Sequence, residues 1–108
     1  MCGIVGIYNL PGAVPLFDGM VARIGHRGPD AAAVERVQGA GFDALLGHLR
    51  LSIIDLSDAA NQPFVKDGMT LVYNGEIYNY RELKAELVAL GHSFRTASDT
   101  EVVLEAWR

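Results

Sequence analysis

Directly after Met1 the chain has an uncharged, β-branched and apolar segment, Cys2-Gly3-Ile4-Val5-Gly6-Ile7-Tyr8, which stops shortly before Pro11-Gly12. This composition, bounded by a Pro-Gly pair, is typical of a short core strand. We therefore expect residues 2–9 to form a strand that is buried on both faces of its sheet. The glycines within it predict places where another group approaches the backbone closely.

Composition excludes several classes of protein. The 108 residues suit one domain, and 9 Lys+Arg against 13 Asp+Glu give a net charge of −4, which argues against nucleic acid or an anionic membrane as partner. The single cysteine cannot close an intramolecular disulfide, and no apolar run approaches the roughly 20 residues of a spanning helix. The first basic residue is Arg23, so we expect no signal peptide and a cytoplasmic location.

Glycine-centred turns predict two β-hairpins. Residues 34–37 and 42–46 flank Gly39-Ala40-Gly41, and the second arm continues to residue 54. Asp67-Gly68 supplies a positive-φ turn before a strand at residues 69–73. Residues 55–64 are expected to form a loop. Gly28-Pro29 excludes regular structure from residues 26–30, a loop that could line a pocket mouth but that we interpret as a structural brace.

Three helices are predicted from periodicity and from their ends. Leu16, Met20 and Ile24 form an apolar stripe that ends at Gly25. A second helix has an Asn79–Glu82 capping box, a stripe of Leu83, Leu87 and Leu90, and a stop at Gly91. A third has a Ser98–Glu101 box and is short when the chain reaches Arg108, so it needs a partner surface and its end looks cut.

Cys2 is the residue with the most distinctive chemistry. Removal of Met1 would place a thiol and a free α-amine on one residue, and an α-amine with a reference pKa near 7.7–8 can act as a general base at neutral pH. This is the N-terminal nucleophile arrangement, which needs no separate histidine. Position alone is equally compatible with a small buried hydrophobic residue.

Four segments together resemble one family, the N-terminal glutaminase domain of class II glutamine amidotransferases. They are Met1-Cys2-Gly3-Ile4-Val5-Gly6, His26-Arg27-Gly28-Pro29-Asp30, Tyr73-Asn74-Gly75-Glu76-Ile77-Tyr78-Asn79 and Ser98-Asp99-Thr100-Glu101. The segments Leu49-Arg50-Leu51-Ser52-Ile53-Ile54-Asp55 and Asn61-Gln62-Pro63 resemble the asparagine synthetase type. The resemblance implies an α+β fold, the N-terminal part of an αββα N-terminal-nucleophile hydrolase sandwich. Residues 1–108 would be the N-terminal portion of the glutaminase domain.

The resemblance also implies roles for individual residues. Cys2 would attack the carboxamide of L-glutamine, and Asn74 and Gly75 would form the oxyanion hole. The remaining matched residues would bind the substrate: Arg50 its α-carboxylate, Asp99 its α-ammonium, Glu76 in the same shell, and Leu51 and Ile53 through their backbone. Each side chain also has an ordinary structural interpretation, such as a turn at Asn74-Gly75 or a helix-start charge at Asp99.

Three functions therefore remain open. The first is glutamine hydrolysis that supplies ammonia to an asparagine-synthetase-like enzyme; the second is another class II amidotransferase, making glucosamine 6-phosphate or phosphoribosylamine. The third is a non-catalytic module that associates with itself, because an incomplete sandwich leaves strand edges open. We expect no cofactor in this chain, with ATP and magnesium bound by an absent synthetase domain. No metal is expected, since the histidines lack zinc-like spacing.

Overall fold

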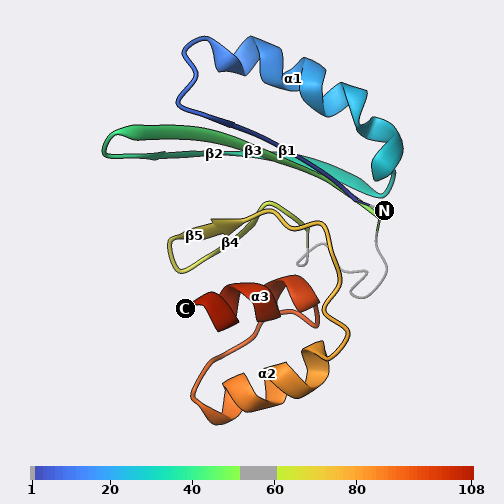
Figure 1. Cartoon of the computed structure of the whole chain (residues 1–108), viewed down its shortest axis with the longest axis vertical. Coiled ribbons are helices and arrows are strands. Elements are labelled where there is room, and N and C mark those ends of the chain that lie inside the picture. Colours follow the sequence, from blue (N-terminus) through green and yellow to red (C-terminus); the bar gives the residue numbers. More distant parts are fainter. Residues whose placement is uncertain (1, 52–60) are drawn as a thin grey trace.

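The computed structural model describes residues 2–51 and 61–108 as four layers (Figure 1). Helix α1 (Ala13–Arg23) covers one face of a three-stranded antiparallel sheet, in which β3 (Phe42–Arg50) lies between β1 (Gly3–Tyr8) and β2 (Ala31–Gly39). A two-stranded hairpin lies beyond the other face of that sheet. Helix α3 (Asp99–Trp107) forms the fourth layer beside the hairpin, and helix α2 (Tyr80–Ala89) packs on the far side of α3. This arrangement confirms the expected α+β class and fits the N-terminal part of an αββα sandwich.

The predicted central hairpin is confirmed. Strands β2 (Ala31–Gly39) and β3 (Phe42–Arg50) pair in antiparallel register around a turn in which Gly41 has a φ of +78°. Strand β2 begins at Ala31, earlier than the predicted residue 34, whereas β3 ends at Arg50, before the predicted residue 54; residues 52–54 lie outside the described part of the chain. Strand β3 lies between its two neighbours and ends at Arg50, so its last residue reaches the end of the sheet where the chain begins.

Strand β1 (Gly3–Tyr8) is an edge strand, and the prediction that it is buried on both faces is wrong. Val5 and Ile7 pack against the core beneath α1, whereas Ile4 is 47% and Tyr8 68% exposed. The alternation shows that only the α1 face of this strand is covered. A continuous apolar run cannot by itself distinguish that situation from burial on both faces.

Helix α1 buries a different face from the predicted one. Ala13 and Phe17 are buried and Val21 packs beside them, whereas Leu16 is 59% exposed. The predicted stripe therefore misses the true one by a quarter turn. Gly47 of β3 explains the choice, because a side chain there would meet Val5 and the ring of Phe17; glycine leaves room for that ring.

The segment after α1 braces the ends of two strands. Gly25–Arg27 form one 3₁₀ turn, η1, which corrects the expectation that residues 26–30 contain no regular structure. A Cβ at Gly28 would lie 2.2 Å from the carbonyl carbon of Leu49, so only glycine permits this approach to β3. Asp30 N–H donates to the Arg50 carbonyl at 3.0 Å. These contacts fit the structural interpretation of the loop.

The second predicted hairpin is also confirmed. Strands β4 (Phe64–Lys66) and β5 (Met69–Leu71) pair across a turn in which Asp67 and Gly68 have φ values of +50° and +78°. Two successive positive φ angles match the right-handed twist of short antiparallel strands. Strand β5 is shorter than predicted, because pairing ends at Leu71.

Helix α2 (Tyr80–Ala89) begins and ends where predicted, but its capping box does not form. Asn79 is the N-cap residue, yet its side chain makes no capping hydrogen bond. Gly91, with a φ of +97°, follows the last turn. Leu83 and Leu87 are half-buried, whereas Leu90 is 77% exposed, so the leucine stripe is only partly covered.

Helix α3 (Asp99–Trp107) forms half of its predicted box. Ser98 Oγ accepts from Thr100 N–H at 3.0 Å, but the Glu101 carboxylate does not turn back to Ser98. It accepts instead from Thr96 N–H at 2.8 Å and from Lys66 Nζ at 2.8 Å. Burial of Glu101 among these donors explains the difference, because several donors outweigh one capping bond.

A buried ionic cluster fastens α3 to β4. Lys66 Nζ contacts Glu105 Oε1 at 2.6 Å, and His92 Nδ1 lies 2.7 Å from Glu105 Oε2. Burial alone would raise the pKa of Glu105, but the hydrogen bonds from Lys66 and His92 outweigh it and lower the pKa to about 2. The cluster joins the hairpin layer to the helix layer.

Candidate active site

The predicted nucleophile lies beside the end of β3. Pairing of Gly3 with Leu49 brings Cys2 next to the two residues that follow, and Cys2 Sγ accepts from Leu51 N–H at 3.3 Å. Its side chain is half-buried. An amide N–H directed at sulfur fixes the orientation of the thiol.

Arg50 immediately precedes Leu51 and is buried, with an exposed fraction of 7%. Leu45 and Gly47 face α1, so alternation along β3 directs the Arg50 side chain toward the hairpin layer. Its Nη1 donates to Asn61 Oδ1 at 2.6 Å. The guanidinium is therefore held close to the strand that positions the thiol.

Asp99 holds the other group of predicted residues together. It is the first residue of α3, is 6% exposed, and its Oδ2 accepts from Ile77 N–H at 3.0 Å. Asn74, Gly75 and Glu76 lie in the exposed loop between β5 and α2, directly before Ile77. This hydrogen bond links Asp99, the predicted ammonium-binding residue, to the loop that carries the predicted oxyanion donors and Glu76.

Tyr73 shapes that loop from within. A Cβ built on Gly75 would lie 2.7 Å from Tyr73 Oη and 2.8 Å from Cζ, so the phenol rests against the glycine and excludes any larger residue there. Burial raises the pKa of Tyr73, and the negative charges of Asp99 and Glu76 raise it further. The hydroxyl is therefore held protonated near both carboxylates.

Gln62 connects the loop to α3. Its Oε1 accepts from Tyr73 N–H at 2.5 Å and its Nε2 donates to Thr100 Oγ1 at 3.2 Å. The preceding residue, Asn61, contacts Arg50 as described above. The Asn61-Gln62 pair thus contacts both groups of predicted residues. No role is predicted for it from the sequence, although polar residues beside Pro63 were part of the family resemblance.

His48 is the second buried group to which the sequence assigns no role. It is 1% exposed, and within the described part of the chain neither ring nitrogen makes a hydrogen bond. Burial lowers the pKa of His48, the backbone of Tyr73 counteracts this in part, and the positive charge of Arg50 lowers it again. The ring is therefore neutral and lies between the two groups of predicted residues.

The predicted site residues thus form two groups. Cys2, Leu51 and Arg50 lie together at the end of β3, and Asn74, Gly75, Glu76 and Asp99 lie together where the β5–α2 loop meets α3. Ile53 lies outside the described residues. Within residues 2–51 and 61–108, no hydrogen bond joins Cys2 directly to Asn74, and Asn61-Gln62 provides the connection.

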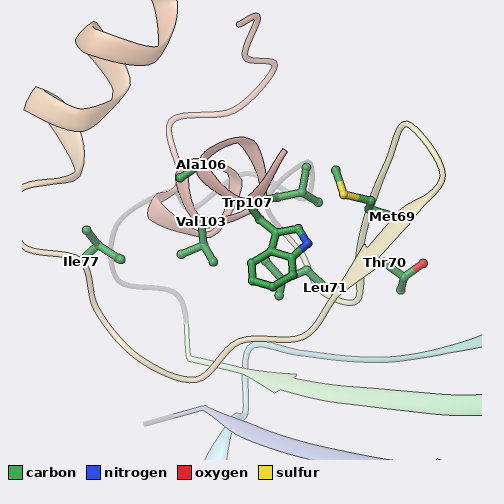
Figure 2. A pocket seen from close by; sticks show the side chains of 8 residues that line it. Met69, Thr70, Leu71, Ile77, Val103, Ala106 and Trp107 are labelled. Atoms are coloured by element: carbon green, nitrogen blue, oxygen red, sulfur yellow. The ribbon is translucent and has the colours of Figure 1, made fainter.

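One pocket in the described part of the chain is lined by none of these predicted site residues. It has a volume of about 670 Å³ and an apolar lining that includes Leu71, Ile77, Val103 and Trp107, on the side of α3 that faces β5 (Figure 2). The indole of Trp107 lies in the middle of that lining, and the residue as a whole is 86% exposed. An amino acid needs charged partners at both of its ends, so this pocket does not suit one.

Two features are absent from the described residues, 2–51 and 61–108. No group of three or more His, Cys, Asp or Glu side chains is arranged to hold a metal ion in this part of the chain. Among the same residues, no helix has the length and apolar character needed to cross a membrane.

Similarity to known proteins defines the class to which this chain belongs. A family model described as a glutamine amidotransferase domain matches residues 1–108, and the chain belongs to this family. The glutamine-hydrolysing asparagine synthetase 1 of Bacillus subtilis is 41% identical over 116 residues, covering 100% of this chain and 18% of that protein. Asparagine synthetase 2 of the same organism is 42% identical over 117 residues, covering 99% and 14%.

A different amidotransferase also matches. The chloroplastic amidophosphoribosyltransferase of Vigna aconitifolia is 34% identical over 131 residues, covering 95% of this chain and 27% of that protein. The chain therefore spans less than a third of the length of each of these relatives, and it matches their glutamine amidotransferase part.

Proposed function

We propose that this chain is the N-terminal portion of a glutaminase domain that hydrolyses L-glutamine to glutamate and ammonia at Cys2. The observation that carries the proposal is the 3.3 Å contact between Cys2 Sγ and Leu51 N–H, because Leu51 directly follows Arg50. A thiol and a guanidinium on neighbouring positions suit a substrate with a carboxamide at one end and a carboxylate at the other.

The first half of the reaction forms a thioester. With Met1 removed, the α-amine of Cys2 accepts the thiol proton while sulfur attacks the carboxamide carbon. The negative charge that develops on oxygen is stabilised by the Asn74 side-chain amide and the Gly75 N–H. The same amine then delivers the proton to the departing nitrogen, the C–N bond breaks, and ammonia leaves.

The second half consumes one water molecule. The α-amine takes a proton from water as the hydroxide adds to the thioester carbon, and the C–S bond breaks to give glutamate and the regenerated thiol. Arg50 binds the α-carboxylate throughout, with the backbone of Leu51 and Ile53 beside it. Asp99 and Glu76 bind the α-ammonium. Their fixed attachment to the β5–α2 loop aligns substrate and oxyanion donors.

Asparagine synthesis is the proposed use of the ammonia. The names of the Bacillus subtilis relatives and the motifs around Arg50 and Asn74 support it. The amidophosphoribosyltransferase match supports phosphoribosylamine synthesis as the alternative. In the asparagine type, a synthetase domain outside this chain would bind ATP and magnesium. Aspartate-dependent asparagine formation by the full-length protein distinguishes the two.

The direct test is glutamate release from glutamine by the full-length protein, with intact mass measured on quenched samples. We expect Met1 to be absent and a glutamyl adduct to appear on Cys2. Full turnover with Met1 retained, or with no cysteine at position 2, would disprove the mechanism.

A non-catalytic, self-associating module is the second candidate function. The exposed Trp107 in the apolar pocket favours it, since large exposed apolar surface promotes association. Light scattering together with glutamate release separates the two candidates. An associating protein that releases no glutamate would favour the module.

A further inference from the structure

Tyr73 takes part in the candidate site in a way that none of the predicted roles includes. Its phenol lies against the backbone of Gly75, one of the two proposed oxyanion donors, closely enough that a Cβ there would be 2.7 Å from Oη. A side chain in such contact with a flexible residue restricts where that residue's N–H can point. Tyr73 is therefore adjacent to the reacting group without being part of it.

The position of Tyr73 is fixed independently of its ring. Gln62 Oε1 accepts from the backbone N–H of Tyr73 at 2.5 Å. Gln62 Nε2 donates to the hydroxyl of Thr100, the second residue of α3. Asp99, the first residue of the same helix, holds Ile77 on the far side of the loop. Both ends of the segment from Tyr73 to Ile77 are thus attached to one helix terminus, and the phenol lies within that loop.

The negative charges of the two carboxylates proposed to bind the substrate's ammonium group, Asp99 and Glu76, act on the phenol and raise its pKa. Asp99 and Glu76 are both near enough to favour the neutral, protonated phenol. A protonated phenol can donate its hydrogen to a carboxylate and still accept a hydrogen bond through its oxygen lone pairs. An ammonium group brings three N–H donors, so two carboxylates leave one donor for a third oxygen.

We propose that Tyr73 is a specificity residue that supplies this third oxygen and so selects substrates bearing an α-ammonium group. The inference rests on the proposed glutaminase function. The same ring lies against Gly75. An ammonium group bound at Oη therefore holds the ring in its position beside this oxyanion donor. An amide that lacks the ammonium group leaves this contact unmade.

The test compares two substrates in the full-length protein. Glutamine carries the ammonium group, and 4-carbamoylbutanoate is the same molecule without it. Tyr73→Phe removes only the hydroxyl, and Tyr78→Phe is the matched control because Tyr78 is 89% exposed. We expect Tyr73→Phe to lower kcat/KM for glutamine about tenfold, the effect of one hydrogen bond to a charged group. The value for 4-carbamoylbutanoate should not change.

Inhibition provides the same comparison without turnover. Glutamate should lose about tenfold in affinity for Tyr73→Phe while glutarate is unaffected. An equal loss for both members of either pair, or no loss for either, would overturn the role of Tyr73. In those cases the wild-type protein still hydrolyses glutamine, whereas failure of the proposed function itself would appear as no glutamate release by wild type.

Discussion

Gln62 and Tyr73 are joined by a short hydrogen bond, in which the side-chain oxygen of Gln62 accepts from the backbone N–H of Tyr73 at 2.5 Å. The other side-chain atom of Gln62 donates to Thr100, so one amide fixes the start of the β5–α2 loop relative to α3. Neither partner is a predicted catalytic residue. Their contact nevertheless fixes the backbone position of Tyr73, the residue directly before Asn74.

Gln62→Leu should therefore destabilise the protein and slow catalysis. Leucine has a similar size but leaves the Tyr73 N–H without its buried partner, at a cost of about 1–3 kcal/mol. We expect a lower midpoint in urea and a reduced kcat as Asn74 loses its position. Gln38→Leu, on an exposed position of β2, is the control. An unchanged midpoint would show that this bond contributes little.

Cys2→Ala should abolish glutamate release and leave the fold nearly intact. In the proposed mechanism the thiol forms the covalent bond, whereas its packing contribution is that of a small side chain that is only half-buried. The free energy of unfolding should change by about 1 kcal/mol or less. Retention of Met1 should be almost as damaging, because it removes the free amine of Cys2. Persistent turnover by Cys2→Ala would show that another group is the nucleophile.

Arg50 and Asp99 should control KM for glutamine more than kcat. Their proposed contacts are with the α-carboxylate and α-ammonium, which do not change during bond cleavage. Arg50→Lys and Asp99→Asn should each raise KM about 10- to 100-fold. Asp99→Asn retains an oxygen that can accept from Ile77 N–H, so it removes charge without releasing the loop. Arg36→Lys, in an exposed pair with Asp43, is the control for arginine. A normal KM with a low kcat would contradict these roles.

Acid should weaken the attachment of α3 through Glu105. Its pKa is 4.5 as an ordinary glutamate and about 2 in the folded protein. The folded state therefore holds fewer protons between these values, and stability present above pH 4.5 is lost as the pH falls toward 2. The difference amounts to about 3 kcal/mol. Unfolding in urea across this pH range measures it.

Glu105→Gln should remove that part of the pH dependence, and Glu82→Gln should not. Glu82 is exposed at the start of α2 and serves as the matched control. An equally steep loss of stability with acid in Glu105→Gln would show that other carboxylates are responsible.

The 108-residue chain by itself should associate with further copies of itself. It should also hydrolyse glutamine more slowly than the full-length protein. Trp107 is 86% exposed in an apolar pocket, so burying it against a second copy removes apolar surface from water. We expect light scattering to give a mass above 11.7 kDa that falls toward that value in Trp107→Ala. Tyr78→Ala, equally exposed but outside the pocket, is the control. A wild-type monomer at all concentrations would contradict self-association.

Local signals in the sequence predicted the turns and helix ends better than the buried faces. Asp67-Gly68 and Gly91 dictate positive φ angles that almost no other residue adopts, and both are found where expected. The face that α1 buries was predicted wrongly, because Leu16 and Met20 are as apolar as Phe17. Only the missing side chain at Gly47, which pairs with Val5 of β1 and leaves space for the Phe17 ring, selects Phe17.

For the site, the family motifs predict which residues to expect there but not how those residues are held. Asp99 holds Ile77 through a bond across 22 residues, and Gln62 holds Tyr73 across 11. Neither separation follows from any periodicity. Glu101 does not cap α3 for a similar reason, because it accepts a hydrogen bond from Lys66, which lies in a hairpin far away in the sequence.

The edge position of β1 affects the order in which the site assembles during synthesis. Cys2 and its hydrogen-bond partner Leu51 are 49 residues apart, and β1 has no pairing partner until β3 has been made. At roughly 5–20 residues per second, ribosomes need about 2–10 s to extend the chain from one to the other. Until β3 has followed β1 out of the ribosome, the N-terminus is an unpaired strand. The amine that the proposed mechanism requires can thus be uncovered before pairing with β3 draws it into the sheet.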